Sequence, residues 1–135
     1  MATVVNECVP RYRPGQRITA QTTAPVVGKR LLAVSGSFTS GPGLNTATDG
    51  SNIQVATAGA GLACFGISAY DAASGAKVPV IHDGVNPVTA DGGITAGQQI
   101  EVGTAGKAKA KASGIAVGYA ISTALDGADV YVRLY

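Results

Sequence analysis

The chain has 135 residues and a formal net charge of +2, and only 13% of its residues are charged, about half of the roughly 25% that is typical of globular proteins. This length fits one compact domain with an arm and excludes two full-sized cores. A net charge this small indicates no particular class of partner.

The side chains are small for a globular domain. The chain has 19 glycines, no tryptophan, two phenylalanines and five tyrosines. Large apolar side chains provide most of the free energy of burial, at about 25 cal/mol per Å², whereas glycines cost conformational entropy when they become ordered. We therefore expect a thin core that gains stability from a partner surface, as in a component of an assembly.

The start of the chain shows no export signal. No charged segment is followed by an apolar one there, so we predict no signal peptide, and no apolar run approaches the roughly 18 residues that a membrane span needs. Cys8 and Cys64 have neither C-x-x-C nor metal-site spacing. A disulfide between them stays open, but we expect reduced thiols because the protein is expected to assemble in the cytoplasm.

Residues 1–26 differ from the rest, and we interpret them as an extended N-terminal arm. Three of the six prolines lie in this segment, and prolines at this density prevent a helix and favour extended backbone. Short strands at 3–5 and 17–21 are compatible with such an arm. A disordered leader is the alternative interpretation.

The same end of the chain carries the positive charge. Residues 1–30 contain five Lys or Arg and one acidic residue, whereas residues 31–135 contain five basic and seven acidic residues. A basic segment of this kind binds nucleic acid or an acidic protein surface. Because Tyr12 is the only aromatic residue among the arginines, we expect a protein surface and no nucleic acid.

From residue 27 onward, short β-type runs alternate with Gly-rich turns, which predicts an all-β domain over residues 27–135. The runs recur at intervals of about 8–12 residues, as in a small β-barrel or sandwich. A long loop is expected at 35–51, and only 71–74 and 122–125 can form a helical turn. The predicted strands are 29–35, 53–57, 62–70, 77–82, 98–103, 115–122 and 130–135.

Side-chain alternation assigns faces to the last two strands. In the final strand, Tyr131, Arg133 and Tyr135 are expected to point outward, and the apolar residues between them inward. The residues expected to share one face of the preceding strand are Ile115, Val117, Tyr119 and Ile121.

The sequence contains an internal repeat. Residues 66–81 align without a gap to residues 118–133, with identical glycines and valines at corresponding positions. Each copy reads as a strand, a crossover of small residues, a glycine turn and a second strand. A twofold repeat suits a small closed barrel, which has no exposed sheet edge. The alternative is a chance similarity between two Ala- and Gly-rich stretches.

Reactive residues are scarce. His82, the only histidine, lies beside Asp83 without the G-x-S-x-G segment that would position a serine for a Ser-His-Asp triad. One histidine cannot supply a multi-histidine zinc site, and the acidic residues lack EF-hand spacing. The glycines form neither a dinucleotide fingerprint nor a P-loop. We predict no catalytic, cofactor-binding or metal-binding residue, and no enzyme activity.

Lys107, Lys109 and Lys111 alternate along one predicted strand. A carrier domain, in which Lys107 would be lipoylated or biotinylated, needs one lysine isolated at a tight turn. Three alternating lysines favour a solvent-exposed face or a charged sheet edge instead.

Residues 60–135 resemble a known family, the small capsid decoration (cement) proteins of tailed bacteriophages. Residues 1–60 match this family less well. The motifs that carry the resemblance, in chain order, are Gly66-Ile67, the small-residue stretch 72–75, Val78 and Val80, ITAG at 94–97, GKA at 106–108, 115–118, and the terminal V-x-V-x-L from Val130.

The resemblance implies a β-barrel-like fold, no enzyme activity, and binding to the major capsid protein on the outer surface of the expanded head. It also implies homo-oligomers, often trimers. Because the arm is basic and extended, we expect it to provide the contact with the capsid. The expected capsid-binding residues are Val4, Val5, Arg11, Arg13 and Arg17.

Other virion surface modules fit the same composition, namely a head-fibre base, a tail component or a carbohydrate-binding β-domain. A glycan-binding module usually has a cluster of exposed aromatic side chains, and the seven aromatic residues here are scattered along the sequence. We therefore favour the decoration protein.

Overall fold

The structure, a computed structural model, describes residues 5–9, 17–36 and 52–135. Over these residues the chain forms ten β-strands and one short 3-10 turn, which confirms the predicted all-β class. The predicted strand at 3–5 lies mostly outside the described residues, as does most of the predicted loop at 35–51.

The first five strands form a closed barrel, the first barrel, in the order β1-β3-β2-β4-β5. Neighbouring strands are antiparallel, except that β1 and β3 pair in parallel and so close the barrel. The strands are β1 (Arg17–Thr22), β2 (Leu31–Gly36), β3 (Ile53–Thr57), β4 (Gly66–Ser68) and β5 (Lys77–Ile81).

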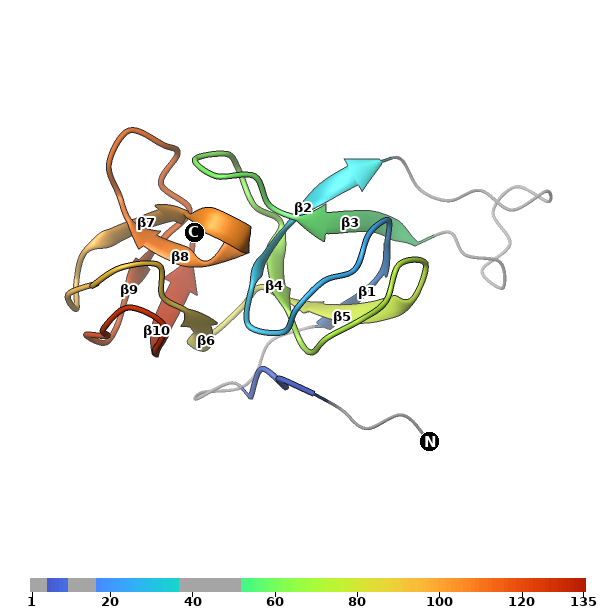
Figure 1. Ribbon diagram of the computed structural model, residues 1–135, viewed down its shortest axis with the longest axis horizontal. Coiled ribbons are helices and arrows are strands. Elements are labelled where there is room, and N and C mark those ends of the chain that lie inside the picture. Colours follow the sequence, from blue (N-terminus) through green and yellow to red (C-terminus); the bar gives the residue numbers. More distant parts are fainter. Residues whose placement is uncertain (1–4, 10–16, 37–51) are drawn as a thin grey trace.

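The last five strands form a second sheet in the order β6-β10-β9-β7-β8. A parallel bridge between Ala90 and Ala108 brings the ends of its two outer strands together, so this sheet also curls into a barrel-like half. Figure 1 shows the two halves side by side along the long axis. The elements are β6 (Asn86–Thr89), β7 (Gln99–Val102), η1 (Thr104–Gly106), β8 (Ala108–Ala110), β9 (Gly118–Ala120) and β10 (Asp129–Leu134).

The two halves are copies of one topology. β1 to β5 correspond in order to β6 to β10, and every strand pair of the first barrel has its counterpart in the second half. The match extends to single hydrogen bonds, since the Thr22 amide donates to Ala76 at 2.9 Å and the Ala90 amide donates to Ala128 at 2.8 Å. The sequence repeat of β4–β5 and β9–β10 is therefore one part of a duplication that covers all ten strands, and it produces two halves rather than one barrel.

One turn shows how the copies diverged. Gly97 has a φ of 90°, and Lys29 has a φ of 60° at the corresponding position before β2. A side chain is strained in this left-handed region. The lysine is held by its ion pair, because its Nζ lies 3.0 Å from a carboxylate oxygen of Asp129 in the other half.

Two apolar clusters form the core. The interior of the first barrel is one cluster, and the second joins the interior of the second sheet to the outer face of β2, β4 and β5. On that outer face Leu31 pairs with Ile67 and Ile67 with Ile81, and all three side chains are at most 2% exposed. We call these three residues the interface row. Because they are buried between the halves, the halves should unfold together.

Several expectations differ from the structure. Residues 17–22, expected in the arm, form β1 of the barrel, as the strand predicted at 17–21 anticipated. No strand was predicted at 86–89, because Asn86-Pro87 resembles a turn signal, but β6 pairs with β10 and tolerates Pro87 as an outer strand. The segments 71–74 and 122–125 are bridges and turns rather than helical turns.

Replacing Ile67 with alanine should lower the free energy of unfolding by about 2–5 kcal/mol, because the change leaves a cavity between the halves. Chemical denaturation followed by circular dichroism should show one transition, shifted to lower denaturant. Leu125→Ala is the control, since this side chain is 79% exposed and its loss should change stability little. Two separate transitions would contradict the shared core.

Candidate interaction surfaces

The expected capsid-binding residues fall partly inside the described chain. Val5 lies exposed in the segment 5–9, which we call the strap, and Arg17 lies exposed at the start of β1. Val4, Arg11 and Arg13 lie outside the described residues. The structure thus locates two of the five residues, one on each side of the segment 10–16.

The strap is tied to the body by Asp71. The Asp71 amide donates to the carbonyl of Val5 at 3.0 Å, and the Asn6 side chain donates to both carboxylate oxygens of Asp71 at 3.0 Å. The same carboxylate accepts the amide of Gly28 at 2.8 Å. Charge-assisted hydrogen bonds of this kind are the stronger ones, so the strap is part of the folded body.

Cys8 fixes the other end of the strap. Its amide donates to the carbonyl of Ala69, its thiol lies 3.4 Å from the carbonyl of Pro87, and its side chain is fully buried in the cluster that joins the halves. Burial raises the pKa of the Cys8 thiol to about 12 and that of Cys64 to about 11. Both cysteines are free rather than disulfide-bonded, and both stay protonated at neutral pH.

His82 is held by two neighbours. Its Nδ1 lies 3.1 Å from a carboxylate oxygen of Asp83, and its Nε2 lies 3.1 Å from the carbonyl oxygen of Tyr135. Both neighbours are hydrogen-bond acceptors, so the ring nitrogen that carries the proton can donate to one of them. Within the described ranges, no three His, Cys, Asp or Glu side chains gather as a possible metal site, and no helix has the length and apolarity to cross a membrane.

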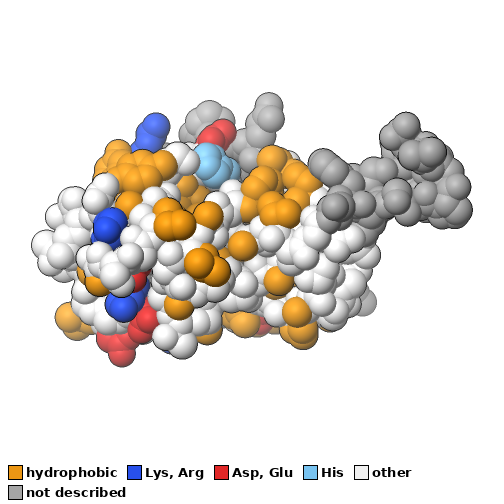
Figure 2. All heavy atoms as spheres, turned by 90° about the horizontal axis from the view of Figure 1, so that it is seen from above, with side chains coloured by type: hydrophobic (Ala, Val, Ile, Leu, Met, Phe, Trp, Pro, Cys, Tyr) orange, Lys and Arg blue, Asp and Glu red, His pale blue; other side chains and the backbone are white. Residues whose placement is uncertain are grey.

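An apolar hollow of about 370 Å³ opens beside the end of β2. Val34 and Leu62 are more than half exposed in it. A smaller groove of about 180 Å³ continues from it past His82 to Tyr135, and the two share Ala63 and Cys64. Figure 2 shows hydrophobic side chains gathered on this face around the histidine. The residues that line the hollow are Ala33, Val34, Gly59, Leu62, Ala63, Cys64 and Phe65.

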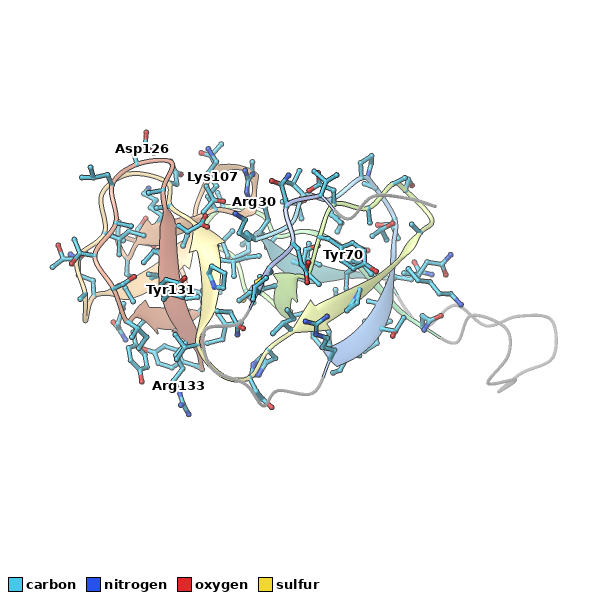
Figure 3. All side chains as sticks on the ribbon, turned by 90° about the horizontal axis from the view of Figure 1, so that it is seen from below. Arg30, Tyr70, Lys107, Asp126, Tyr131 and Arg133 are labelled. Atoms are coloured by element: carbon cyan, nitrogen blue, oxygen red, sulfur yellow. The ribbon has the colours of Figure 1, made fainter. Side chains whose placement is uncertain are left out.

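The outer face of the second sheet gathers polar and aromatic side chains. Gln99 pairs with Tyr119 and Tyr119 with Arg133 across β7, β9 and β10. We call these three residues the exposed row, in which Gln99 and Arg133 are exposed and Tyr119 is half-buried. The rings of Tyr119 and Tyr135 lie 6.1 Å apart, and the Gln99 side chain donates to the Tyr135 hydroxyl at 2.8 Å. Figure 3 shows Arg133 projecting from the edge of the second half opposite to Asp126.

Sequence reasoning missed this surface for a definite reason. Tyr119 and Ile121 were expected to share a face with Val117, but Val117 is buried and Ile121 is exposed, because the strand is only three residues long and the alternation breaks before it. The predicted outward direction of Arg133 and Tyr135 agrees with their exposure, and pairing with β9 brings tyrosines from distant positions together.

The sequence and the fold have counterparts among known proteins. Residues 12–134 match the family described as phage cement protein. The chain belongs to this family. Its members are structural proteins of the phage virion, which confirms the resemblance drawn from residues 60–135 and extends it through the first barrel.

A solved structure shares the fold of this cement family member. The crystal structure of the head fiber gp8.5 N base in bacteriophage phi29 aligns with a TM-score of 0.68 at 22% sequence identity, over 90% of this chain and 95% of the phi29 chain. No curated protein sequence matches the chain.

Replacing Asp71 with alanine should release the strap. The variant loses the hydrogen bonds to Asn6 and Gly28, which should lower local stability by about 1–3 kcal/mol. Native-state hydrogen exchange should show the Cys8 and Gly28 amides exchanging about 5- to 150-fold faster. Asp83→Ala is the matched control, and equal exchange in both variants would contradict the role of Asp71.

Glu101 provides a pH-dependent contribution to stability. Hydrogen bonds from the amides of Ala112 at 2.9 Å and Gly114 at 2.7 Å, with help from Lys109 and Lys111, hold the pKa of this buried carboxyl below its usual value. A lowered folded-state pKa stabilises the protein fully above the unfolded value of about 4.3, and the contribution is lost as the pH falls through the folded value.

Glu101→Gln should therefore lower the melting temperature at pH 7 and have progressively less effect as the pH falls below about 4.3. Thermal melts of both proteins between neutral and acidic pH measure this difference. Asp83→Asn, which removes an exposed carboxylate, is the control. A difference that stays constant with pH would show that the carboxylate charge is not what stabilises the loop.

Proposed function

We propose that the protein is a decoration protein that binds the major capsid protein on the outer surface of the assembled phage head and stabilises it. The observation that carries this proposal is the match to the phage cement family over residues 12–134. A protein that binds the assembled shell but not its dissociated subunits stabilises the shell by mass action. We further propose assembly in the host cytoplasm, where the free Cys8 and Cys64 would stay reduced.

This role needs no catalysis, and the polar groups of the described chain are consistent with that. Each nitrogen of His82 lies 3.1 Å from an acceptor oxygen, both thiols are protonated, and the carboxylates of Asp71 and Glu101 accept backbone amides. The two carboxylates therefore already have a structural use. We propose that the protein acts by binding alone, without a cofactor.

The contact with the capsid is assigned to the N-terminal arm, now limited to the residues before β1. The strap attaches the arm to the body. In sequence, Val4 precedes the strap, Val5 is its first residue, and Arg11 and Arg13 follow it. Arginine suits such a contact because its guanidinium pairs with carboxylates in a bidentate way. Extended backbone beside it can add to a strand edge of the capsid protein.

The arm proposal is tested on shells that lack the protein. Removing residues 2–4 and replacing Arg11 and Arg13 with alanine should weaken binding and reduce the heat resistance of decorated shells. Exposed ion pairs contribute about 0–1 kcal/mol each, so the two arginine changes alone should raise the Kd by up to about 30-fold, and less at high salt. A longer deletion to residue 20 is unsuitable because it would remove most of β1.

A double variant of the body serves as the matched control for charge. Lys77→Ala with Lys111→Ala removes the same number of positive charges from exposed positions, and it should bind as the native protein does. If the arm variants bind normally while the lysine variant does not, the capsid contact lies on the body.

A head-fibre base is the second candidate function. The observation that favours it is the similarity to the fibre base of phi29 over 90% of the chain. A base carries a projection away from the capsid, whereas a cement protein forms a compact cap. Negative-stain images of decorated heads distinguish the two by the presence or absence of fibres.

A further inference from the structure

We propose that copies of this protein join head to tail, with the free end of the first barrel of one copy packed on the exposed row of the next. This inference rests on the proposed decoration function and on the homotrimer that the family resemblance implies, and it names the interface of that trimer. The internal duplication supports this interface, because the contact between the two halves within one chain shows how one half can bind another.

Within one chain, the outer face of the first barrel covers an end of the second sheet. The interface row belongs to the same buried cluster as Val102 at the end of β7. The Gly61 amide donates to the Val102 carbonyl at 2.8 Å, and the Thr89 amide donates to the Lys29 carbonyl at 3.0 Å. The backbones are close, since a Cβ on Gly106 would lie 2.8 Å from the carbonyl oxygen of Leu31.

The outer face that makes this contact occurs twice, and in its second copy Gln99 and Arg133 are exposed and Tyr119 is half-buried. The interface row on β2, β4 and β5 corresponds to the exposed row on β7, β9 and β10. Next to these rows, Ala69 is 0% exposed between the halves, whereas its counterpart Ile121 is 41% exposed. The second half thus exposes the face that corresponds to the one with which the first half binds the second.

The end that receives this contact also occurs twice. Val102 is 0% exposed under the first barrel, and its counterpart Val34 is 57% exposed at the end of β2. Val34 lines the apolar hollow with Leu62 and Phe65. Each copy therefore carries one uncovered surface of each kind, and the two surfaces are complementary in the way that the halves already are.

The residue types of the two rows fit the stage at which each row is covered. The interface row is Leu and Ile, and it is covered as soon as the chain folds. The exposed row is Gln, Tyr and Arg, residue types that stay soluble before assembly, and Tyr and Arg are enriched at protein interfaces. The contact is heterologous, so repeated copies form either a closed ring or an open filament, and the trimer that the family resemblance implies is a closed ring.

The test uses one aspartate substitution on each surface. Val34→Asp should block the barrel end and Ile121→Asp the sheet face, while Leu125→Asp is the matched control at a 79% exposed position near Asp126. Circular dichroism confirms that each variant is folded. Light scattering at high protein concentration, and images of decorated shells, should show trimers for the native chain and the control, and monomers for the two variants.

Mixing the variants distinguishes a head-to-tail contact from a symmetric one. The Val34→Asp copy keeps its sheet face, and the Ile121→Asp copy keeps its barrel end. These two intact surfaces can still bind each other, so the mixture should form a one-to-one pair, while each variant alone stays monomeric. Trimers that survive both substitutions, or a native chain that is monomeric in solution and on shells, would overturn the proposal.

Capsid binding is measured separately on the same proteins. If Ile121→Asp remains trimeric but loses binding to shells, the sheet face contacts the capsid and the inference is wrong. Arm variants that lose shell binding but remain trimeric would leave the inference intact and confirm the assignment of the arm.

Discussion

Burial of Leu31, Ile67 and Ile81 between the two halves is the contact on which the rest of the structure depends. These side chains lie on the outside of the first barrel and belong to the larger cluster, so each half alone would expose part of its apolar surface. The chain is poor in large apolar residues. It buries enough apolar surface because one outer face of its first half covers the apolar interior of the second. Cys8 of the strap enters the same cluster, so the root of the arm is positioned by the contact that joins the halves.

Carboxylates that hold backbone turns supplement this thin core. Asp71 holds the strap and Glu101 holds the loop after β8. Asp91 accepts the amide of Thr104 at 2.8 Å, and Asp126 accepts that of Gly92 at 2.8 Å. Ionised acceptors form stronger hydrogen bonds than neutral ones, so a few acidic residues order long loops that have little apolar surface. Among these groups, the lowered pKa of Glu101 makes part of the stability depend on pH in the acidic range.

The sequence allowed the all-β class, most strands and the family to be predicted, because alternation, glycine turns and the spacing of motifs are local signals. It did not show that β1 belongs to the barrel or that 86–89 is a strand, since both depend on partners distant in the chain. The candidate interaction surfaces were predicted less completely than the fold. The strap is fixed by Asp71, 65 residues after Asn6, and the exposed row is formed only when β7, β9 and β10 pair.

The two halves also show which positions changed in a duplicated fold. Interior positions kept the same residues, as Val78 and Val130 or Val80 and Val132 illustrate, because both copies pack the same small barrel. Outer positions changed: Ile67 corresponds to Tyr119 and Ile81 to Arg133. If the outer face of the second sheet only contacted solvent, short polar residues would be sufficient there. Tyrosine beside arginine instead retains apolar area that water does not favour, and a surface of this composition next to an uncovered Val34 is best explained by a partner that covers both.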